Sequence, residues 1–189
     1  LRRLPDSIPM SPRHESLSSD FLAALEKILG TDGLVADADG VESRTRSCLP
    51  FETLASAVVY PRTVEQVQAV VRAAATANVP IWPVSTGKNF GYGEKSAAYD
   101  AGITMVLERM SGILHVDEQL GYAVIEPGVT YKQINEHLKQ SGSRLWADTA
   151  GSTQFASVLG NALDKGRGLT PMADHFGCLC GMDVVLPDG

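Results

Sequence analysis

Hydrophobic residues recur at helical spacing in three segments of the chain. In SSDFLAALEKILG they form one apolar face, with Ser19 or Asp20 able to cap the start of a helix and Gly30 able to stop it. TVEQVQAVVRAAATAN and YKQINEHLKQSG repeat this spacing, and a threonine–x–x–glutamine pair marks the start of each as a capping box would. The two pairs are Thr63 with Gln66 and Thr130 with Gln133. Three amphipathic helices are therefore predicted.

Short apolar and β-branched runs predict strands between these helices. Four such runs are ASAVVYP, VPIWPV, ITMVLERM and YAVIEPG; the second is expected to be a buried strand, and residues 115–119 to lie near the turn between the last two. The mixture of strands and helices predicts an α+β fold in which helices pack on sheets. A last run, CGMDVVLPDG, predicts a strand that ends in a Pro-Asp-Gly turn, and a strand without a following partner indicates a fragment of a longer protein.

The predicted domain begins near residue 50. Residues 1–49 contain Pro- and Ser-rich and then Asp- and Gly-rich sequence around a single helical pattern, so a lead-in with one helix is expected there. Residues 50–189 carry the strand and helix patterns described above.

Composition and charge exclude several classes of protein. The 189 residues are 44% hydrophobic and 20% charged, which is typical of a globular domain with a core. A formal net charge of -6 without a basic cluster argues against a nucleic-acid surface, and no apolar run is long enough to span a membrane. The three cysteines, Cys48, Cys178 and Cys180, are too few for a disulfide framework and lack the further ligands of a metal site, so a cytoplasmic protein without metal is expected.

The segment most suggestive of chemistry is PVSTGKNFGYG, residues 83–93. Its glycines would let the backbone approach an anion, and successive N–H groups can form an anion-binding nest. It is not a P-loop, because Asn89 follows Lys88 and Trp82 stands where the first glycine is required. It is not a dinucleotide fingerprint, because no helical apolar stripe follows Gly93. The residues alone predict an anion-binding loop without naming the ligand, and a plain glycine-rich turn is the alternative.

Several motifs, in the same order along the chain, resemble the FAD-binding domain of the p-cresol methylhydroxylase and vanillyl-alcohol oxidase family. They are SAVVYPRTVEQVQAVVRAA, VPIWPVSTGKNFGYG, YAVIEPGVTY, SVLGNALDKGRGLTP and DHFGCLCGMDVVLPDG, and they cover residues 50–189. The resemblance implies FAD as the cofactor. It also implies a PCMH-type α+β fold of two α/β lobes, with the C-terminal part of that domain and the substrate cap domain missing from this chain.

The resemblance assigns two stretches to the cofactor. In this family the first loop wraps the FAD pyrophosphate with backbone amides, and the stretch matching residues 157–168 lies along the ribityl chain and pyrophosphate. A tight turn is the alternative for that second stretch. The residues implied in cofactor binding are Pro83, Val84, Ser85, Thr86, Gly87, Lys88, Asn89, Phe90, Gly91, Gly93, Ser157, Gly160, Asn161 and Gly168.

Tyr92 is the residue that the resemblance places at the substrate. In relatives that act on 4-alkylphenols, this tyrosine hydrogen-bonds the phenolate oxygen, whose charge supports a developing quinone methide. The resemblance therefore implies oxidation of para-substituted phenols by hydride transfer to flavin N5. A ring packed over a glycine-rich turn is the alternative for Tyr92.

This chain departs from the family pattern at two places. Residues 168–175 read GLTPMADH where relatives often carry GYTPYGDH, so two aromatic residues and a glycine near the flavin are lost. Asp148 does not fall where the oxidase branch has the aspartate of a P-D-L-G motif, which favours a dehydrogenase. His175 is expected to form a structural hydrogen-bonding pair with Asp174.

The implied partners are a phenolic small molecule, an electron-acceptor protein such as a c-type cytochrome, and further copies of the chain in a homo-oligomer. No nucleic acid or membrane is expected. A periplasmic location is the alternative that the resemblance adds. Two other functions stay open: an FAD-dependent oxidoreductase of the same fold acting on hydroxy acids or sugars, and a flavin-binding fragment without catalysis.

Overall fold

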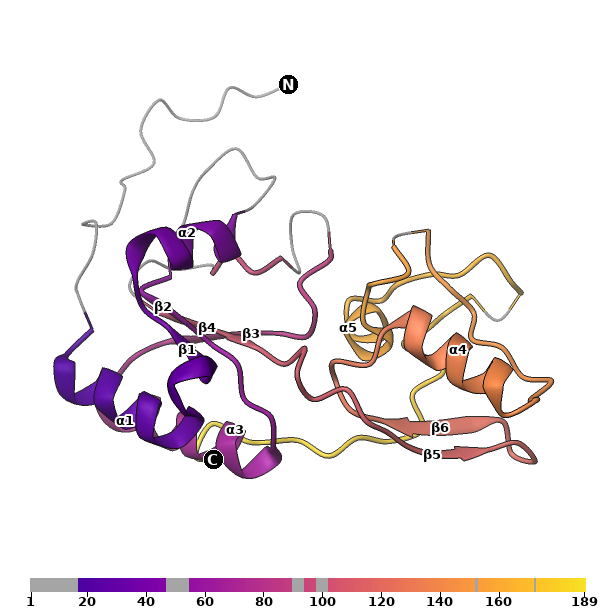
Figure 1. The fold of residues 1–189 in the computed structure, drawn as a ribbon. Helices are drawn as coiled ribbons and strands as arrows, with labels where there is room; N and C mark the ends of the chain where they lie inside the picture. Colours follow the sequence, from indigo (N-terminus) through magenta and orange to yellow (C-terminus); the bar gives the residue numbers. More distant parts are fainter. Residues whose placement is uncertain (1–16, 47–54, 90–93, 98–101, 152, 172) are drawn as a thin grey trace, which may run out of the picture.

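The computed structural model folds into two lobes that lie side by side (Figure 1). It describes residues 17–46, 55–89, 94–97, 102–151, 153–171 and 173–189. A four-stranded sheet forms the centre of the first lobe, and a two-stranded sheet lies in the second. The expected α+β fold of two lobes is confirmed.

The first lobe carries the mainly parallel sheet, whose strands follow the order β1-β2-β4-β3. Strand β4 pairs in parallel with β2 and β3, whereas β1 is antiparallel to β2. The strands are β1 (Leu34–Val35), β2 (Ala57–Val59), β3 (Ile81–Val84) and β4 (Ile103–Val106). The helices are α1 (Ser19–Leu29), α2 (Ala38–Thr45) and α3 (Val64–Ala77), with a short 3-10 turn η1 (Thr31–Gly33).

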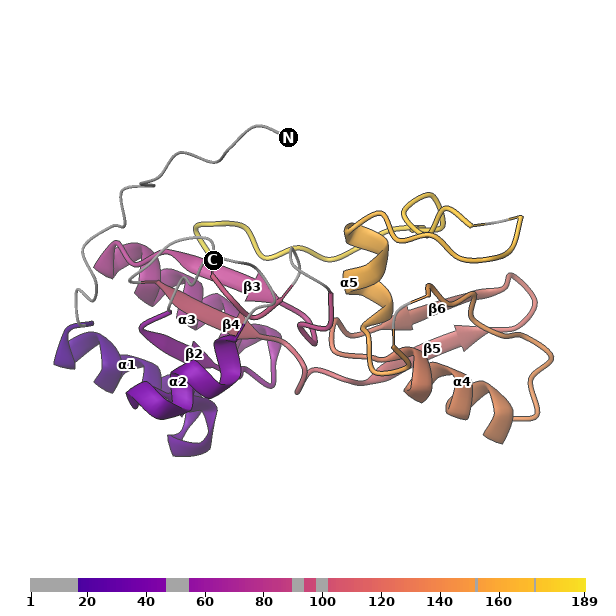
Figure 2. The ribbon, with the colours of Figure 1, turned by 90° about the horizontal axis from the view of Figure 1, so that it is seen from above.

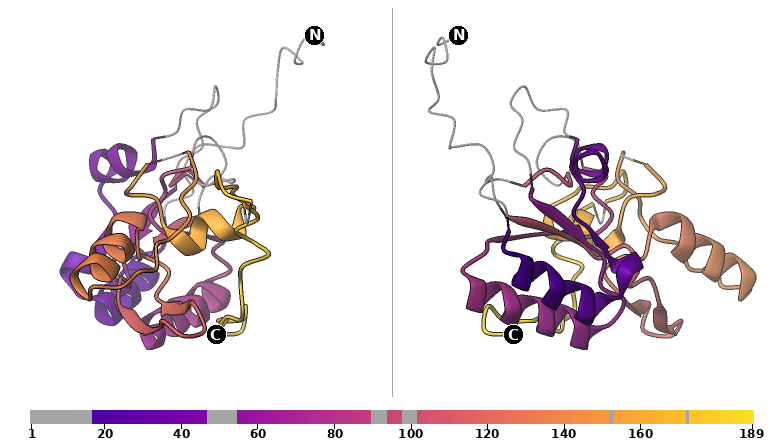
Figure 3. Two further views of the ribbon diagram at one scale, coloured as in Figure 1. Left: turned by 90° about the vertical axis from the view of Figure 1, so that its right-hand side faces the viewer. Right: turned by 60° about the vertical axis from the view of Figure 1, so that its left-hand side comes forward.

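Helices cover both faces of this sheet: α1 and α3 lie on one face and α2 on the other (Figure 3). Successive strand residues point to opposite faces, so Val59 packs with Leu25 and Val70 while Val58 packs with Val41. Burial on both faces explains why the central strands are continuous apolar runs rather than alternating ones.

The helix starts show which capping predictions hold. The N-cap of α1 is Ser18, whose Oγ accepts a hydrogen bond from the Phe21 N–H at 3.2 Å, so the expected cap at Ser19 or Asp20 is wrong. Gly30 ends this helix at a φ of 76°. Ser18 takes the role because its extended backbone brings its hydroxyl to the third N–H of the first turn.

The two predicted capping boxes differ in completeness. Thr130 and Gln133 form both reciprocal bonds at the start of α4 (Tyr131–Gln140). Thr63 caps α3 through the Gln66 N–H, but the Gln66 side-chain oxygen accepts from the Arg62 N–H instead of from Thr63. The Thr63–Gln66 capping box is therefore only half formed.

The second lobe packs α4 on a hairpin of β5 (Ile113–Asp117) and β6 (Tyr122–Ile125). A short helix, α5 (Val158–Leu163), completes it. The expectation that residues 115–119 lie near the turn holds only for Glu118 and Gln119, because β5 runs through Asp117 and the turn spans residues 118–121. A register shift between Ile113 and His115 interrupts the alternation of β5, which hides this strand from a pattern search.

Three other expectations are corrected. The segment before residue 50 has a second helix, α2, and a strand, β1, that joins the main sheet. VPIWPV is not a buried central strand: β3 lies at the edge of the sheet, where Pro83 is exposed and its missing N–H costs no ladder bond.

The third correction concerns the final strand. Residues 179–186 have no strand partner among the described residues, and Figure 2 shows this segment returning from the second lobe towards α3. There Arg72 Nη1 donates to the Gly189 carbonyl oxygen at 2.8 Å.

In the part of the chain that the structure describes, no helix is long and apolar enough to cross a bilayer.

The core between α1, α3 and the sheet gives the first testable prediction. Leu25 is fully buried there, so Leu25→Ala removes apolar contacts and leaves a cavity. We expect the free energy of unfolding to fall by about 2–5 kcal/mol. Denaturant titration of the protein measures this loss. Glu26→Ala, at the next and exposed position, is the control, and a loss at Leu25 no larger than at Glu26 would contradict the assigned core.

Candidate functional site

The two stretches that the sequence analysis selected meet in one cleft between the lobes. Residues 85–89 follow the carboxyl end of β3, and residues 156–164 include α5. Eight of the predicted cofactor residues line the cleft, together with Ala156 and Asp164. These eight are Ser85, Thr86, Gly87, Lys88, Asn89, Ser157, Gly160 and Asn161.

Ser157 joins the two sides of the cleft. Its backbone N–H donates to Thr86 Oγ1 at 3.1 Å, across 71 positions of the sequence. Its hydroxyl donates to the Pro127 carbonyl oxygen at 2.7 Å and accepts from the Gly160 N–H at 3.0 Å, which caps α5. Ser157 is 3% exposed, so these bonds are made in a dry environment where their loss is costly.

Two glycines allow this close approach of the cleft walls. A Cβ on Gly160 would overlap the Oγ of Ser85, so only glycine lets α5 lie this near the first loop. Gly87 has a φ of 61°, a left-handed conformation that other residues adopt only with strain, and a Cβ there would overlap the Lys95 side chain.

The first loop offers a run of unused backbone donors. Within the part of the chain that the structure describes, no protein group accepts a hydrogen bond from the backbone N–H groups of residues 85–89. Successive free N–H groups beside a glycine are the donors that an anionic phosphate requires. The cleft can therefore hold an anion with its main chain.

Asp164 is a cleft residue that the sequence analysis missed. Its carboxylate accepts a hydrogen bond from Asn89 Nδ2 at 2.6 Å and so bridges the walls. The cleft has a volume of about 50 Å³ in this conformation. No sequence signal marks Asp164, because its partner lies 75 positions away and the pairing depends on the packing of α5.

Three of the described cofactor predictions, Pro83, Val84 and Gly168, do not line the cleft. Pro83 and Val84 belong to β3, and Val84 packs in the core under α2. Gly168 lies against Asp148, whose carboxylate a Cβ at this position would overlap. The remaining predicted residues, Phe90, Gly91, Tyr92 and Gly93, lie outside the described residues.

A polar cluster lies directly behind Asn161. The Tyr131 hydroxyl donates to Asn161 Oδ1 at 3.0 Å, and His175 Nδ1 lies 2.6 Å from the same oxygen. On its other side, His175 Nε2 lies 3.5 Å from the Asp148 carboxylate. The expected pairing of His175 with Asp174 is wrong, because the Asp174 carboxylate accepts from a turn N–H instead.

Burial and charge shift two pKa values in this cluster. The hydrogen bond from Thr170 to Asp148, at 2.7 Å, holds the pKa of this carboxyl below its ordinary value against the effect of burial, and His175 adds to the lowering. Burial raises the pKa of Tyr131 to about 12, and the Asp148 charge acts in the same direction. At neutral pH Asp148 is therefore ionised and Tyr131 is a neutral hydrogen-bond donor.

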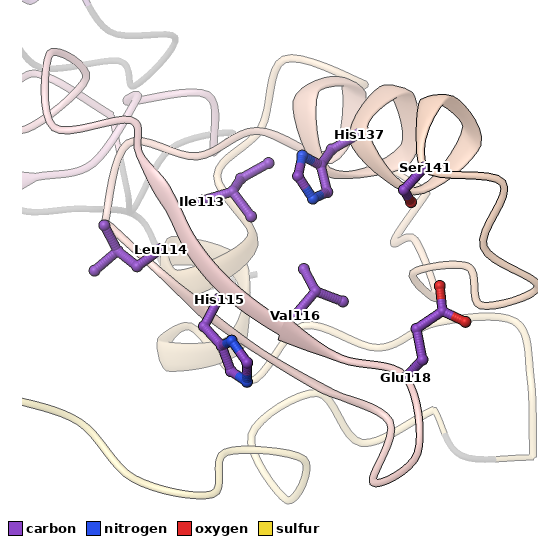
Figure 4. Close-up of a pocket in the computed structure, with 7 residues that line it drawn as sticks. All are labelled: Ile113, Leu114, His115, Val116, Glu118, His137 and Ser141. Carbon is purple, nitrogen blue, oxygen red and sulfur yellow. The ribbon is translucent and has the colours of Figure 1, made fainter.

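A larger cavity of about 300 Å³ lies elsewhere, between β5 and the C-terminal end of α4 (Figure 4). Ile113 and Val116 form its apolar wall, and His137 points into it from α4. It contains no residue of either predicted loop. Size alone does not identify the functional site, and the backbone N–H donors of residues 85–89 favour the smaller cleft.

Among the described residues, no cluster of three His, Cys, Asp or Glu side chains could hold a metal ion.

Comparison with known proteins identifies the family of the chain and its cofactor. The signature of a family described as FAD binding domain matches residues 55–189. The chain belongs to this FAD binding domain family. Its cofactor is FAD, as the resemblance implied.

Individual relatives of this FAD binding domain agree in fold and differ in named activity. The chain is 35% identical over 176 residues to the 4-cresol dehydrogenase [hydroxylating] flavoprotein subunit of Pseudomonas putida, covering 90% of this chain and 34% of that one. It is 39% identical over 168 residues to 1'-carboxy-chondrochloren decarboxylase of Chondromyces crocatus, covering 89% and 31%. The structure of a 4-ethylphenol oxidase from Gulosibacter chungangensis superposes with a TM-score of 0.84 at 34% identity, covering 94% and 35%. The chain thus spans about a third of the length of these relatives.

The contact between Gly160 and Ser85 gives a prediction for cofactor binding. Gly160→Ala should weaken FAD binding about tenfold or more, because its Cβ pushes the first loop away from α5. Removing the obstructing hydroxyl in the double variant Gly160→Ala/Ser85→Ala should restore most of the affinity, since the Ser85 Cβ lies at an ordinary 3.4 Å. Titration of the apoprotein with FAD, followed by flavin fluorescence, measures both.

The control for this prediction is Gly151→Ala, because nothing lies within 4 Å of a Cβ at that position. Unchanged FAD affinity in Gly160→Ala, or equal losses in Gly160→Ala and Gly151→Ala, would show that this contact does not shape the site.

The raised pKa of Tyr131 predicts a change of stability in alkali. The folded pKa of about 12 exceeds the ordinary value of 10.0, so neutral Tyr131 stabilises the fold below pH 10. This contribution is lost as the pH rises towards 12. Wild type should therefore lose free energy of unfolding over this range faster than Tyr131→Phe, which has no proton to lose. Denaturant unfolding of both proteins across the pH range tests this, and parallel curves would contradict it.

Proposed function

We propose that the protein is an FAD-dependent oxidoreductase that oxidises para-substituted phenols of the 4-cresol or 4-alkylphenol type. The observation that carries the proposal is the cleft lined by residues 85–89 and Gly160, in which the N–H groups of residues 85–89 have no acceptor among the described residues. The named activities of the P. putida and G. chungangensis relatives, both on 4-alkylphenols, support the substrate class.

In this proposal the main chain of residues 85–89 and the start of α5 hold the FAD diphosphate. Gly87 and Gly160 let the backbone approach the phosphate oxygens, and Ser157 and Thr86 keep the two walls in register.

FAD held there would supply the hydride acceptor for oxidation of the benzylic carbon of the phenolate, and the oxidised substrate, a quinone methide, would then take up water. Tyr92 would donate a hydrogen bond to the phenolate oxygen. A donor fixed at that oxygen favours the deprotonated phenol, which is the better hydride donor.

A dehydrogenase is favoured over an oxidase. Asp148, the nearest carboxylate in sequence to the aspartate of the oxidase motif, accepts from Thr170 and lies against His175, so it is committed to protein contacts. An electron-acceptor protein such as a c-type cytochrome, and self-association of the chain, belong to the same proposal.

Anaerobic mixing of the flavin-loaded full-length protein with a 4-alkylphenol tests this function. We expect bleaching of the flavin absorbance by the phenol and not by 2-hydroxy acids or sugars. Reduction by a hydroxy acid or sugar alone would replace the phenol by the other substrate class. FAD binding without reduction by any of these compounds would favour a flavin-binding protein without catalysis.

Tyr92→Phe then tests the residue assigned to the phenolate. This change keeps the ring and removes one hydrogen bond to a charged oxygen, which costs about 1.5–3 kcal/mol. Flavin reduction by the phenol should slow by roughly one to two powers of ten. Stopped-flow reduction and FAD titration of both proteins separate this effect from cofactor binding, which should not change. An unaltered reduction rate would remove Tyr92 from the mechanism.

A further inference from the structure

Asn161 is held in one orientation by two buried side chains. Its Oδ1 accepts from the Tyr131 hydroxyl at 3.0 Å and lies 2.6 Å from His175 Nδ1. An amide oxygen has no proton to give, so at this distance the proton lies on Nδ1 and His175 is the donor. Both lone pairs of the Asn161 oxygen are thereby used.

The surroundings leave these groups little freedom. Tyr131 is 4% and His175 7% exposed, and each ring is fixed by the packing of α4 and of the loop after α5. Gly166 lies so close that a Cβ there would overlap the Asn161 amide group. Behind the imidazole, the Asp148 carboxylate lies 3.5 Å from Nε2.

The other end of the Asn161 amide has no such partner. Within the described part of the chain, no protein group accepts a hydrogen bond from its Nδ2, although Asn161 lines the cofactor cleft. Because the oxygen side is occupied by Tyr131 and His175, the NH₂ group is directed away from them. An amide donor fixed at the wall of an anion-binding cleft is suited to a polar oxygen of the cofactor.

We propose that Tyr131 and His175 are positioning residues of the cofactor cleft, which hold the carbonyl oxygen of Asn161 so that its NH₂ group donates to bound FAD. This inference rests on the proposed cofactor cleft. Neither residue touches the cofactor in this arrangement, and both act only through Asn161.

A double-mutant cycle tests this dependence with FAD as the probe. His175→Phe keeps a ring and removes both nitrogens, and it should weaken FAD binding to the apoprotein about tenfold. In the Asn161→Ala background the same change should alter the affinity less than about twofold, because no amide remains to be oriented. Rescue gives a second measure: His175→Asn restores a donor near the Nδ1 position and should bind FAD better than His175→Phe.

His137→Phe is the matched control, since His137 lies in the separate cavity of Figure 4 and should leave FAD affinity unchanged. Tyr131→Phe, which deletes one oxygen atom, repeats the cycle if His175→Phe does not fold. An unchanged affinity in His175→Phe, or a loss that persists in full in the Asn161→Ala background, overturns the positioning role. If Gly160→Ala weakens FAD binding while the double-mutant cycle shows no coupling between His175 and Asn161, the proposed cofactor cleft is supported and only the positioning role is wrong. If Gly160→Ala also has no effect, the proposed cleft itself is wrong.

Discussion

The hydrogen bonds of Ser157 are the constraint on which the candidate cofactor cleft depends. One residue connects the loop after β3, the turn before α4 and the first turn of α5, through the Thr86 hydroxyl, the Pro127 carbonyl and the Gly160 N–H. Because Ser157 is buried, these bonds lie in a low-dielectric environment, where an unpaired polar group is costly. The position of the first loop relative to α5 is thus set by the same residue that joins the two lobes.

The sequence predicted those elements whose hydrophobic spacing is decided by burial on a large core. Helices α1 and α3 and the central strands β2 and β4 share one apolar cluster, and their patterns are correspondingly regular. Helix α2 was missed because only Val41 and Thr45 of its eight residues are buried, which leaves no apolar stripe. Strand β5 was missed because a register shift and an exposed outer face remove the alternation that identifies strands.

The candidate site was predictable where it depends on backbone conformation, and hidden where it depends on tertiary contact. Glycines mark the loop after β3 and the start of α5 in the sequence, since a side chain at Gly87 or Gly160 would collide. The pairs Asn89 with Asp164 and Tyr131 with His175 leave no local pattern, because their members are 75 and 44 positions apart. The local neighbour Asp174 seemed the natural partner of His175, but a turn N–H occupies its carboxylate.

In the cleft, side chains and main chain play different parts, and this difference bears on how one fold serves relatives with different activities. Most polar side chains on its walls contact protein groups. The Thr86 hydroxyl accepts from the Ser157 backbone N–H, and the Ser157 hydroxyl bonds the Pro127 carbonyl and the Gly160 N–H. Asn89 donates to Asp164, and Asn161 accepts from the cluster behind it. The free donors of the first loop belong to the main chain, whose N–H groups survive any substitution that keeps the glycine conformations. If the cleft holds FAD as proposed, recognition of the cofactor places few demands on side-chain identity, which fits relatives named as a dehydrogenase, a decarboxylase and an oxidase at 34–39% identity. On the proposed function, the choice of reaction then lies in side chains that reach the substrate: a change at Tyr92 would affect the chemistry, while a change at Gly160 would affect only whether the cofactor is held.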